Sequence, residues 1–298
     1  MSSERVQVEN TLGALLIGGL LASGFTGVVT TQTVIYLRLY PSDKISLKFL
    51  AFTVWFLDIC HTILISRTIW HELISHFGTM ENASSLPWSL AFTIVNTAVL
   101  TIIVHCFFIY RIYILTEHNY FVSVPLAVLA FGRLAFACLA TGQMITSQTL
   151  STFVRKYTWT FTGDLVLSAV MDVIITVTLC LLLRRQQKKN PSSMDHIFDS
   201  LILYTLETGS LTCIATVLVL ICWLAMPTNL VFMALYLVII KLYANSLLAT
   251  LNTRKQLQRG TSRNNTQGTV GTNPELTPSE TRGSRSGSIR KRSSETQV

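Results

Sequence analysis

Four ionisable residues lie near the middle of long apolar segments: Asp58, Arg133, Asp172 and Lys241. An ionisable side chain deep in a membrane is energetically costly, so it usually faces the interior of a helix bundle and has a partner there. Two acids and two bases at similar depth can neutralise one another, and we expect Lys241 to pair with Asp58 or Asp172. The pattern therefore predicts a layer of paired charges inside a membrane.

Asp58 and His61 are three residues apart, which places them on one face of a helix. Such a pair could relay protons or tune the histidine. It could equally be a hydrogen-bonded pair that fixes helix packing, and we favour this second interpretation. Further polar residues lie nearer the two membrane surfaces: Asp164 towards the outside, and His105, Glu207 and Asn245 towards the cytosol.

A lysine midway along a seventh helix could also carry a retinal Schiff base, but the third apolar segment has no Asp or Glu to act as its counter-ion. We therefore expect no cofactor. The six cysteines all fall in apolar segments and indicate buried free thiols, and no Cys/His cluster indicates a metal site. Phosphate-binding loops, zinc-protease motifs and nucleophile elbows are also absent from the sequence, so we expect no enzyme.

The elements that position these residues are seven apolar helices. Half of the 298 residues are hydrophobic and only 13% are charged, about half the charge density of a soluble domain. A membrane-spanning helix needs roughly 20 mostly apolar residues. Seven segments meet this requirement, and the fourth is the weakest because it contains Arg133: Leu12–Tyr36, Leu47–Ile69, Trp88–Tyr110, Val122–Met144, Thr160–Leu183, Leu201–Ala225 and Leu230–Leu251.

The distribution of Lys and Arg predicts the orientation of these spans. The side that holds the N-terminus and the even-numbered loops carries four of them, and the side that holds the odd-numbered loops and the C-terminus carries seventeen. Positive residues favour the cytosolic side. The fold class is therefore all-α and integral to the membrane: a seven-transmembrane-helix bundle, N-out and C-in, in the plasma membrane or an endomembrane.

Three parts of the chain follow from this topology. Residues 1–11 form a short extracellular N-terminus, residues 12–251 the transmembrane domain, and residues 252–298 a disordered cytosolic tail with a net charge of +6. The basic tail would attract anionic lipid, or would act as a solvated segment that keeps the protein oriented. Ser284, Ser286 and Ser293 lie beside basic residues and are candidates for phosphorylation, and Asn82 lies in an extracellular N-glycosylation sequon.

The first span contains two rows of small residues at four-residue spacing. Ala14, Gly18 and Ala22 form one row, and Gly19, Ser23 and Gly27 form the other. Such rows let helix backbones approach closely. We expect them to pack within the bundle or in a dimer, and the sequence leaves both open.

Three stretches of the chain are similar to a known family. They are Asn10–Gly18, Trp55–His61 and Lys241–Asn252, and the last contains an unusual Lys-x-Tyr-x-Asn-Ser pattern within a span. They resemble a fungal, basidiomycete-type family of seven-transmembrane membrane proteins that share a domain of unknown function. The resemblance implies seven helices and an integral membrane protein, with the shared domain at about residues 160–255, and it implies no substrate.

Receptor-like sensing or signalling is the function that we favour, because transporters often contain inverted repeats or helices broken by Gly and Pro. No inverted repeat is visible, and we expect no proline in the core of any span. A secondary transporter or proton-coupled carrier that uses Asp58, His61, Asp172 and Lys241 is the alternative, and a structural membrane-organising role is a second one. Beyond the lipid bilayer, a cytosolic protein is the candidate partner, and no nucleic acid is expected.

Overall fold

The computed structural model describes residues 2–75, 88–147, 149–189, 195–226 and 230–269. Every element in this part of the chain is helical. In chain order the elements are α1 (Ser2–Leu39), α2 (Ile45–Trp70), the short π-helix η1 (His71–Ser75), α3 (Trp88–Leu115), α4 (Tyr120–Ser147), α5 (Leu150–Lys189), α6 (Asp195–Ala225) and α7 (Val231–Thr269). The glycosylation sequon at Asn82 and the serines Ser284, Ser286 and Ser293 lie outside the described residues.

Seven helices of the described residues are long and apolar enough to cross a membrane, as the sequence predicts. Their apolar segments begin and end within a few residues of the predicted spans, except that the fifth begins eight residues earlier, at Thr152. The fourth span, in doubt because of Arg133, is a helix of 28 residues, Tyr120–Ser147. The chain is therefore a multi-pass membrane protein. The predicted orientation across the membrane stays a prediction.

Two helices contain irregularities. The expectation that no proline interrupts a span is wrong, because Pro125 lies within α4. The helix tolerates it because Pro125 is only five residues from the first residue, Tyr120, so the missing N–H removes one backbone bond near the helix end. In α5 the backbone leaves helical geometry at Tyr157 (φ −126°, ψ 17°), which divides the helix into a short first segment and a long second one.

The C-terminal helix is longer than the predicted span. Residues 252–269 were expected to belong to a disordered tail, but α7 continues through them to Thr269. Lys, Gln, Leu and Arg at positions 255–259 are good helix formers and extend the helix beyond the apolar segment. The chain divides into two compact units, residues 1–261 and residues 262–298. The helices of the first unit hold all the intramembrane polar residues.

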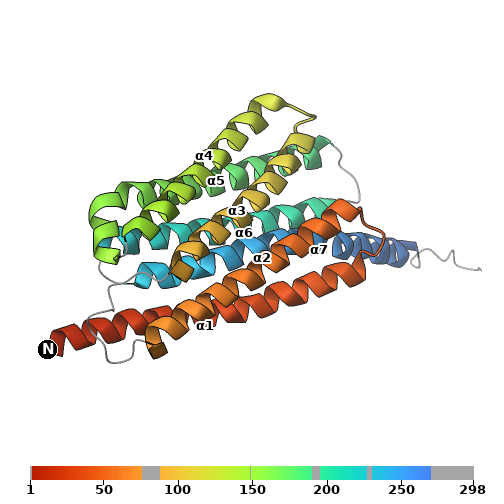
Figure 1. The fold of residues 1–298 in the computed structure, drawn as a ribbon. Coiled ribbons are helices and arrows are strands. Elements are labelled where there is room, and N and C mark those ends of the chain that lie inside the picture. The colour runs from red at the N-terminus through yellow and green to blue at the C-terminus, as the bar shows by residue number, and fades with distance from the viewer. Residues whose placement is uncertain (1, 76–87, 148, 190–194, 227–229, 270–298) are drawn as a thin grey trace, which may run out of the picture. The chain divides into compact units, whose positions relative to one another are not determined.

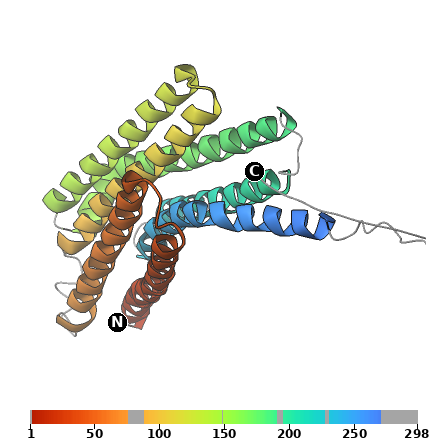
Figure 2. The same cartoon turned by 90° about the vertical axis from the view of Figure 1, so that its right-hand side faces the viewer.

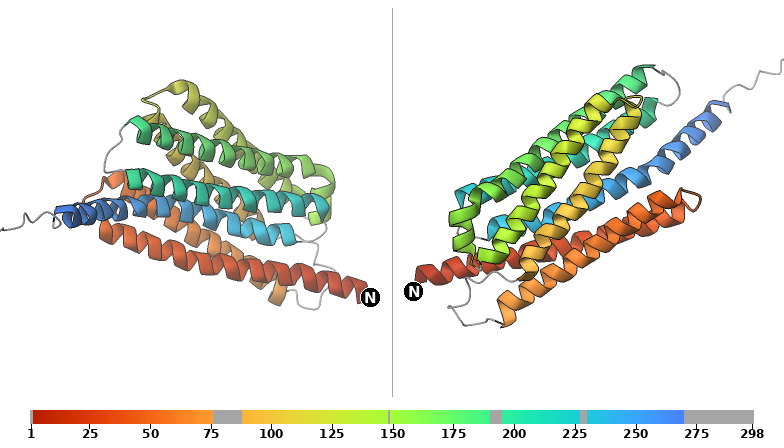
Figure 3. Two further views of the ribbon diagram at one scale, coloured as in Figure 1. Left: turned by 180° about the vertical axis from the view of Figure 1, so that it is seen from behind. Right: turned by 45° about the horizontal axis from the view of Figure 1, so that its top comes forward.

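Within the first unit, α7 and α3 are the central helices. The most apolar window of α7 is 78% buried and that of α3 is 61% buried, whereas the windows of the other five are only 22–33% buried. Figure 1 shows the seven helices running alongside one another, and Figure 2 shows the same helices after a quarter turn. In Figure 3, α7 (blue) lies between α1 (red) and α6 (teal). Polar residues on α7 can therefore reach several neighbours at once.

Small residues of α1 let two other helices approach closely. A Cβ atom on Gly18 would lie 2.7 Å from the backbone of Ala234 in α7, and one on Gly19 would overlap the side chain of Ile69 in α2. No atom lies within 4 Å of such a Cβ on Gly27. Gly18 and Gly19 thus pack inside the bundle, one from each row, and Gly27 does not contribute to that packing.

The cysteines differ from expectation in their exposure. All six are free thiols, as predicted. None is fully buried, because Cys106 and Cys138 are exposed and the other four are partly exposed. Cys222 packs against the hydrophobic core, whereas the exposed Cys106 and Cys138 lie on outer helix faces, where a thiol behaves as a small apolar side chain.

Candidate functional site

Two neighbouring polar residues of α7 point in opposite directions. Lys241 and Tyr243 are two positions apart, which turns their side chains by about 200° around the helix axis. Both are buried, at 0% and 2% exposure. Lys241 contacts α1 and α2, and Tyr243 contacts α5 and α3. The predicted charge layer is thus divided by α7 into two separate polar centres.

The first centre surrounds the ammonium group of Lys241. Its Nζ donates hydrogen bonds to Thr62 Oγ1 (2.7 Å), Thr26 Oγ1 (2.9 Å) and the backbone oxygen of Asp58 (2.9 Å). The carboxylate oxygen Oδ1 of Asp58 lies 2.9 Å from the same nitrogen, and both side chains are fully buried. All three protons of the ammonium group are used, and its charge is neutralised. Lys241 is therefore held by α1 and α2 together.

His61 lies on the same buried face of α2 as Asp58, as the three-residue spacing predicts. Its Nε2 is 3.5 Å from Thr97 Oγ1 of α3, and its Nδ1 has no hydrogen-bond partner among the described residues. The structure describes no hydrogen bond between Asp58 and His61. The carboxylate of Asp58 is directed to Lys241 instead, so the favoured interpretation of a hydrogen-bonded pair is wrong, and each residue joins α2 to a different helix.

The second centre begins with Arg133 of α4. Its Nε lies 3.4 Å from Asp164 Oδ1 of α5, with both side chains almost fully buried. The guanidinium carbon is 5.7 Å from the centre of the Tyr243 ring. An acidic neighbour and an aromatic face together compensate a charge that the fourth span could not otherwise hold. The presence of Arg133 in an apolar span predicts such an acid, but the sequence does not identify which one it is.

Asp172 of α5 lies beside this pair and has different partners. The Tyr243 hydroxyl is 2.7 Å and 2.9 Å from its two carboxylate oxygens, and His105 Nε2 is 3.4 Å from Oδ1. Ser168 Oγ lies 3.0 Å from the Tyr243 hydroxyl. The ring of His105 packs edge-on against that of Tyr243, with 5.6 Å between their centres. One carboxylate thus gathers side chains from α3, α5 and α7.

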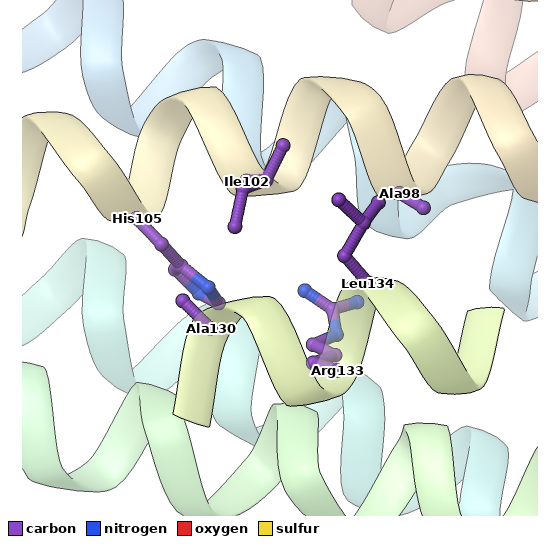
Figure 4. Close-up of a pocket in the computed structure, with 6 residues that line it drawn as sticks. All are labelled: Ala98, Ile102, His105, Ala130, Arg133 and Leu134. Atoms are coloured by element: carbon purple, nitrogen blue, oxygen red, sulfur yellow. The ribbon is translucent and has the colours of Figure 1, made fainter. Parts of the chain in front are cut away.

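Two small pockets meet at His105. The first lies between α3 and α4 and has room for about one water molecule. Figure 4 shows the His105 ring and the Arg133 guanidinium entering it from the two helices, beside Ala98, Ile102, Ala130 and Leu134. The second pocket lies between α3, α5, α6 and α7, and has room for about two water molecules. Its polar lining is His105, Asp172, Thr176, Thr205, Thr208, Thr212, Tyr243 and Ser246.

The remaining predicted residues lie apart from these centres. Glu207 is exposed on the outer face of α6, and Asn245 is partly buried on α7. The side-chain oxygen of Asn245 has no hydrogen-bond partner among the described residues. Lys241 lines neither pocket described above. No group of three or more His, Cys, Asp or Glu that could hold a metal ion occurs in the described part of the chain.

Several residues of the two polar centres were not predicted from the sequence. Thr26, Thr62 and Ser168 are hydroxyl residues in apolar spans, where most hydroxyls bond only to their own helix, so nothing distinguished them. Tyr243 carried a signal, because it is the third residue of the Lys-x-Tyr-x-Asn-Ser pattern. Its position two residues from a buried lysine places it on the opposite face of the same helix, which points to a second polar centre.

The fold and the site define the class: a multi-pass membrane protein with seven helices and two buried polar centres. Residues 168–256 match a family of unknown function (DUF6534). The match begins at Ser168 in α5 and ends at Gln256 in α7, so it includes Asp172, Lys241 and Tyr243 but neither Asp58 nor Arg133. No curated protein and no solved structure matches the chain.

Proposed function

We propose that this protein is a receptor-like membrane protein without enzymatic activity, in which α7 transmits a change from the membrane interior to the cytosolic side. One observation carries the proposal: the ion pair of Asp58 and Lys241 is closed off. Asp58 and Lys241 are both 0% exposed, and each of the three N–H groups of Lys241 is directed to an oxygen atom. A closed pair holds a helix in place, whereas a carrier requires groups that water or substrate can reach.

The division of the polar layer also argues against the relay that the sequence suggests. That relay would join Asp58, His61, Asp172 and Lys241. Neither pocket described here borders Asp58, His61 or Lys241, whereas the second borders Asp172. Tyr243, which bonds to Asp172, points to the side of α7 opposite to Lys241. A proton that passed between the two centres would therefore have to cross the helix itself. The two centres therefore support a mechanical role for α7 better than a conducting one.

A proton-coupled carrier is the second candidate, and His105 favours it. This histidine borders both pockets, with Arg133 in one and Asp172 in the other. A histidine between two water-sized spaces is suited to passing protons, because its two ring nitrogens can accept and donate in turn. In such a carrier the active residues would be His105 and Asp172, and Asp58 and Lys241 would have a structural role only.

The experiment that separates the two candidates measures flux and signalling on the same variants. The full chain is reconstituted in liposomes that contain a pH-sensitive dye, and proton flux is followed after a pH step. We expect the same flux as in protein-free liposomes. Flux above that level, abolished by Asp172→Asn and retained in Asp58→Asn, would support the carrier and contradict the receptor-like proposal.

A positive readout for signalling comes from the cytosolic side. A proximity-labelling enzyme is fused to the C-terminus, and the labelled proteins are compared between the unmodified chain and Lys241→Met in cells. Because Lys241 holds α7 against α1 and α2, we expect its loss to change which cytosolic proteins are labelled. Glu207→Gln alters an exposed charge of α6 and should leave the set unchanged. An identical set in all three would refute transmission through α7.

The cellular setting is proposed from the sequence. The resemblance favours a fungal plasma membrane or endomembrane, and the basic residues beyond position 252 favour anionic lipid as a partner on the cytosolic side. Fluorescence microscopy of the tagged full chain tests the first point. Binding of the tail peptide to vesicles with and without phosphatidylserine tests the second, and equal binding to both would refute it.

A further inference from the structure

The charges buried in the described part of the bundle do not balance. Three carboxylates are buried, Asp58, Asp164 and Asp172, against two permanent cations, Arg133 and Lys241. Lys241 neutralises Asp58 and Arg133 neutralises Asp164. The carboxylate left over is Asp172, which is 5% exposed. An uncompensated charge in a membrane interior is costly, so a further positive charge is expected at this position.

The side chains that contact Asp172 provide hydrogen bonds without a permanent positive charge. Tyr243 donates its hydroxyl proton to the carboxylate, and a hydroxyl is neutral. His105 lies 3.4 Å away and is charged only if it is protonated. Arg133, the nearest permanent cation of α4, already pairs with Asp164. The geometry therefore satisfies the hydrogen bonding of Asp172 but pairs no permanent positive charge with it.

Threonines as well as apolar side chains line the pocket beside Asp172. Three of its threonines lie on α6 and donate their hydroxyl protons to their own helix: Thr205 to Leu201 O (2.7 Å), Thr208 to Tyr204 O (2.7 Å) and Thr212 to Gly209 O (3.0 Å). A hydroxyl whose proton is used in this way can act towards the pocket only as an acceptor. A carboxylate and three acceptor oxygens suit a positively charged occupant.

We propose that the pocket formed by Asp172, Thr205, Thr208 and Thr212 binds a single sodium ion. Oxygen donors are the ligands of hard cations. One positive charge balances the buried carboxylates, whereas a divalent ion would leave an excess positive charge. The pocket has room for about two water molecules, which suits a small ion that keeps one water rather than a large organic cation. Since the four ligand residues lie on α5 and α6, the bound ion stabilises the packing of these two helices.

Thermal unfolding of the purified full chain in nanodiscs tests the proposal. At mildly alkaline pH and constant ionic strength, sodium chloride is exchanged for choline chloride. A ligand that binds only the folded state raises the Tm, and sodium at ten times its Kd should raise it by about 3 °C, in a saturable way. An equal effect of choline would show general screening and overturn the proposal. So would the absence of any sodium effect, because a proton on Asp172 or His105 would then balance the charge.

Matched variants locate the site. Asp172→Asn keeps the shape and removes the charge, so the sodium-dependent rise in Tm should be lost. Thr212→Val removes one acceptor oxygen and should raise the half-saturating sodium concentration about tenfold, as expected for one bond to a charged group. The control is Thr216→Val, one turn further along α6, which is equally buried but does not line the pocket.

The outcome is decisive in both directions. Loss of the sodium effect in Asp172→Asn, together with a shift in Thr212→Val and none in Thr216→Val, supports the site. A sodium effect that persists in Asp172→Asn places the ion elsewhere and overturns it, as does an equal shift in Thr212→Val and Thr216→Val. The double variant Asp58→Asn with Lys241→Met removes the buried pair on the opposite side of α7 and should retain the response.

Discussion

Breaking the ion pair between Lys241 and Asp58 should destabilise the bundle strongly. Lys241→Met leaves the carboxylate of Asp58 buried, with its cation 2.9 Å away removed. Both side chains are 0% exposed, so water cannot replace the lost partner. Removal of one member of a buried pair costs about 3–5 kcal/mol. Asp58→Asn should cost a similar amount, because it leaves the ammonium group charged.

The double variant of Asp58 and Lys241 gives the coupling energy between the two residues. With Asp58→Asn and Lys241→Met together no charge stays buried, and Thr26 and Thr62 can still bond to each other across 2.8 Å. We expect the double variant to lower the free energy of unfolding by about 2 kcal/mol, because the buried amide has no hydrogen-bond partner and the packing is looser. The two single costs would add to roughly 6–10 kcal/mol, so the coupling energy should be at least about 4 kcal/mol.

The assay is unfolding of the full chain in mixed micelles with increasing dodecyl sulfate, followed by far-ultraviolet circular dichroism. Glu207→Gln is the control, because it neutralises an exposed carboxylate of α6 and should cost less than about 0.5 kcal/mol. Two results would refute the reasoning. One is a cost for Lys241→Met no larger than that of the control, and the other is a double variant whose cost equals the sum of the singles.

Three further predictions concern packing, the second polar centre and topology. Gly18→Val should destabilise the bundle by about 1–3 kcal/mol in the same unfolding assay, because its Cβ would meet the Ala234 backbone at 2.7 Å; Gly27→Val, with open space around it, should be neutral, and equal costs would contradict the packing. Tyr243→Phe removes the hydroxyl that bonds both oxygens of Asp172 and should cost about 1.5–3 kcal/mol, whereas Tyr204→Phe on the exposed face of α6 should cost almost nothing. Expression in a eukaryotic host should yield a glycan at Asn82 that Asn82→Gln abolishes, and a C-terminal tag that protease reaches only after cells are opened; a tag cleaved on intact cells would reverse the orientation.

The spans could be predicted because length and apolarity alone decide whether a helix can cross a membrane. The fourth was the hardest, since Arg133 interrupts its apolar character. Its partner could not be identified in advance, because Asp164 and Asp172 both lie on α5 and either could have reached α4. The structure places Asp164 on Arg133. The choice depends on the relative axial positions of two helices, which hydropathy does not encode.

The inward faces of the helices were predictable in part, from the polar residues alone. The buried residues of α2 form a stripe at alternating spacings of three and four: Ala51, Val54, Asp58, His61, Ile65 and Thr68. The exposed face of the same helix carries Phe49, Phe52, Phe56 and Ile63, so it is as apolar as the buried face. Apolarity cannot distinguish the two faces of such a helix. Asp58, His61 and Thr68 can, since lipid excludes them and the bundle interior does not.

The same reasoning explains why α7 needs polar residues on two opposite faces. Lipid tails are as apolar as leucine, so burial of apolar surface gives little preference for one rotation of a transmembrane helix over another. A helix at the centre of the bundle has neighbours on all sides and no exposed face to orient it. Lys241, directed to α1 and α2, and Tyr243, directed to α5, fix its rotation from both sides. A rotation of α7 by one residue, about 100°, would remove both sets of contacts at once. Any signal that passes through α7 must therefore either shift the helix along its axis or exchange both sets of polar partners together.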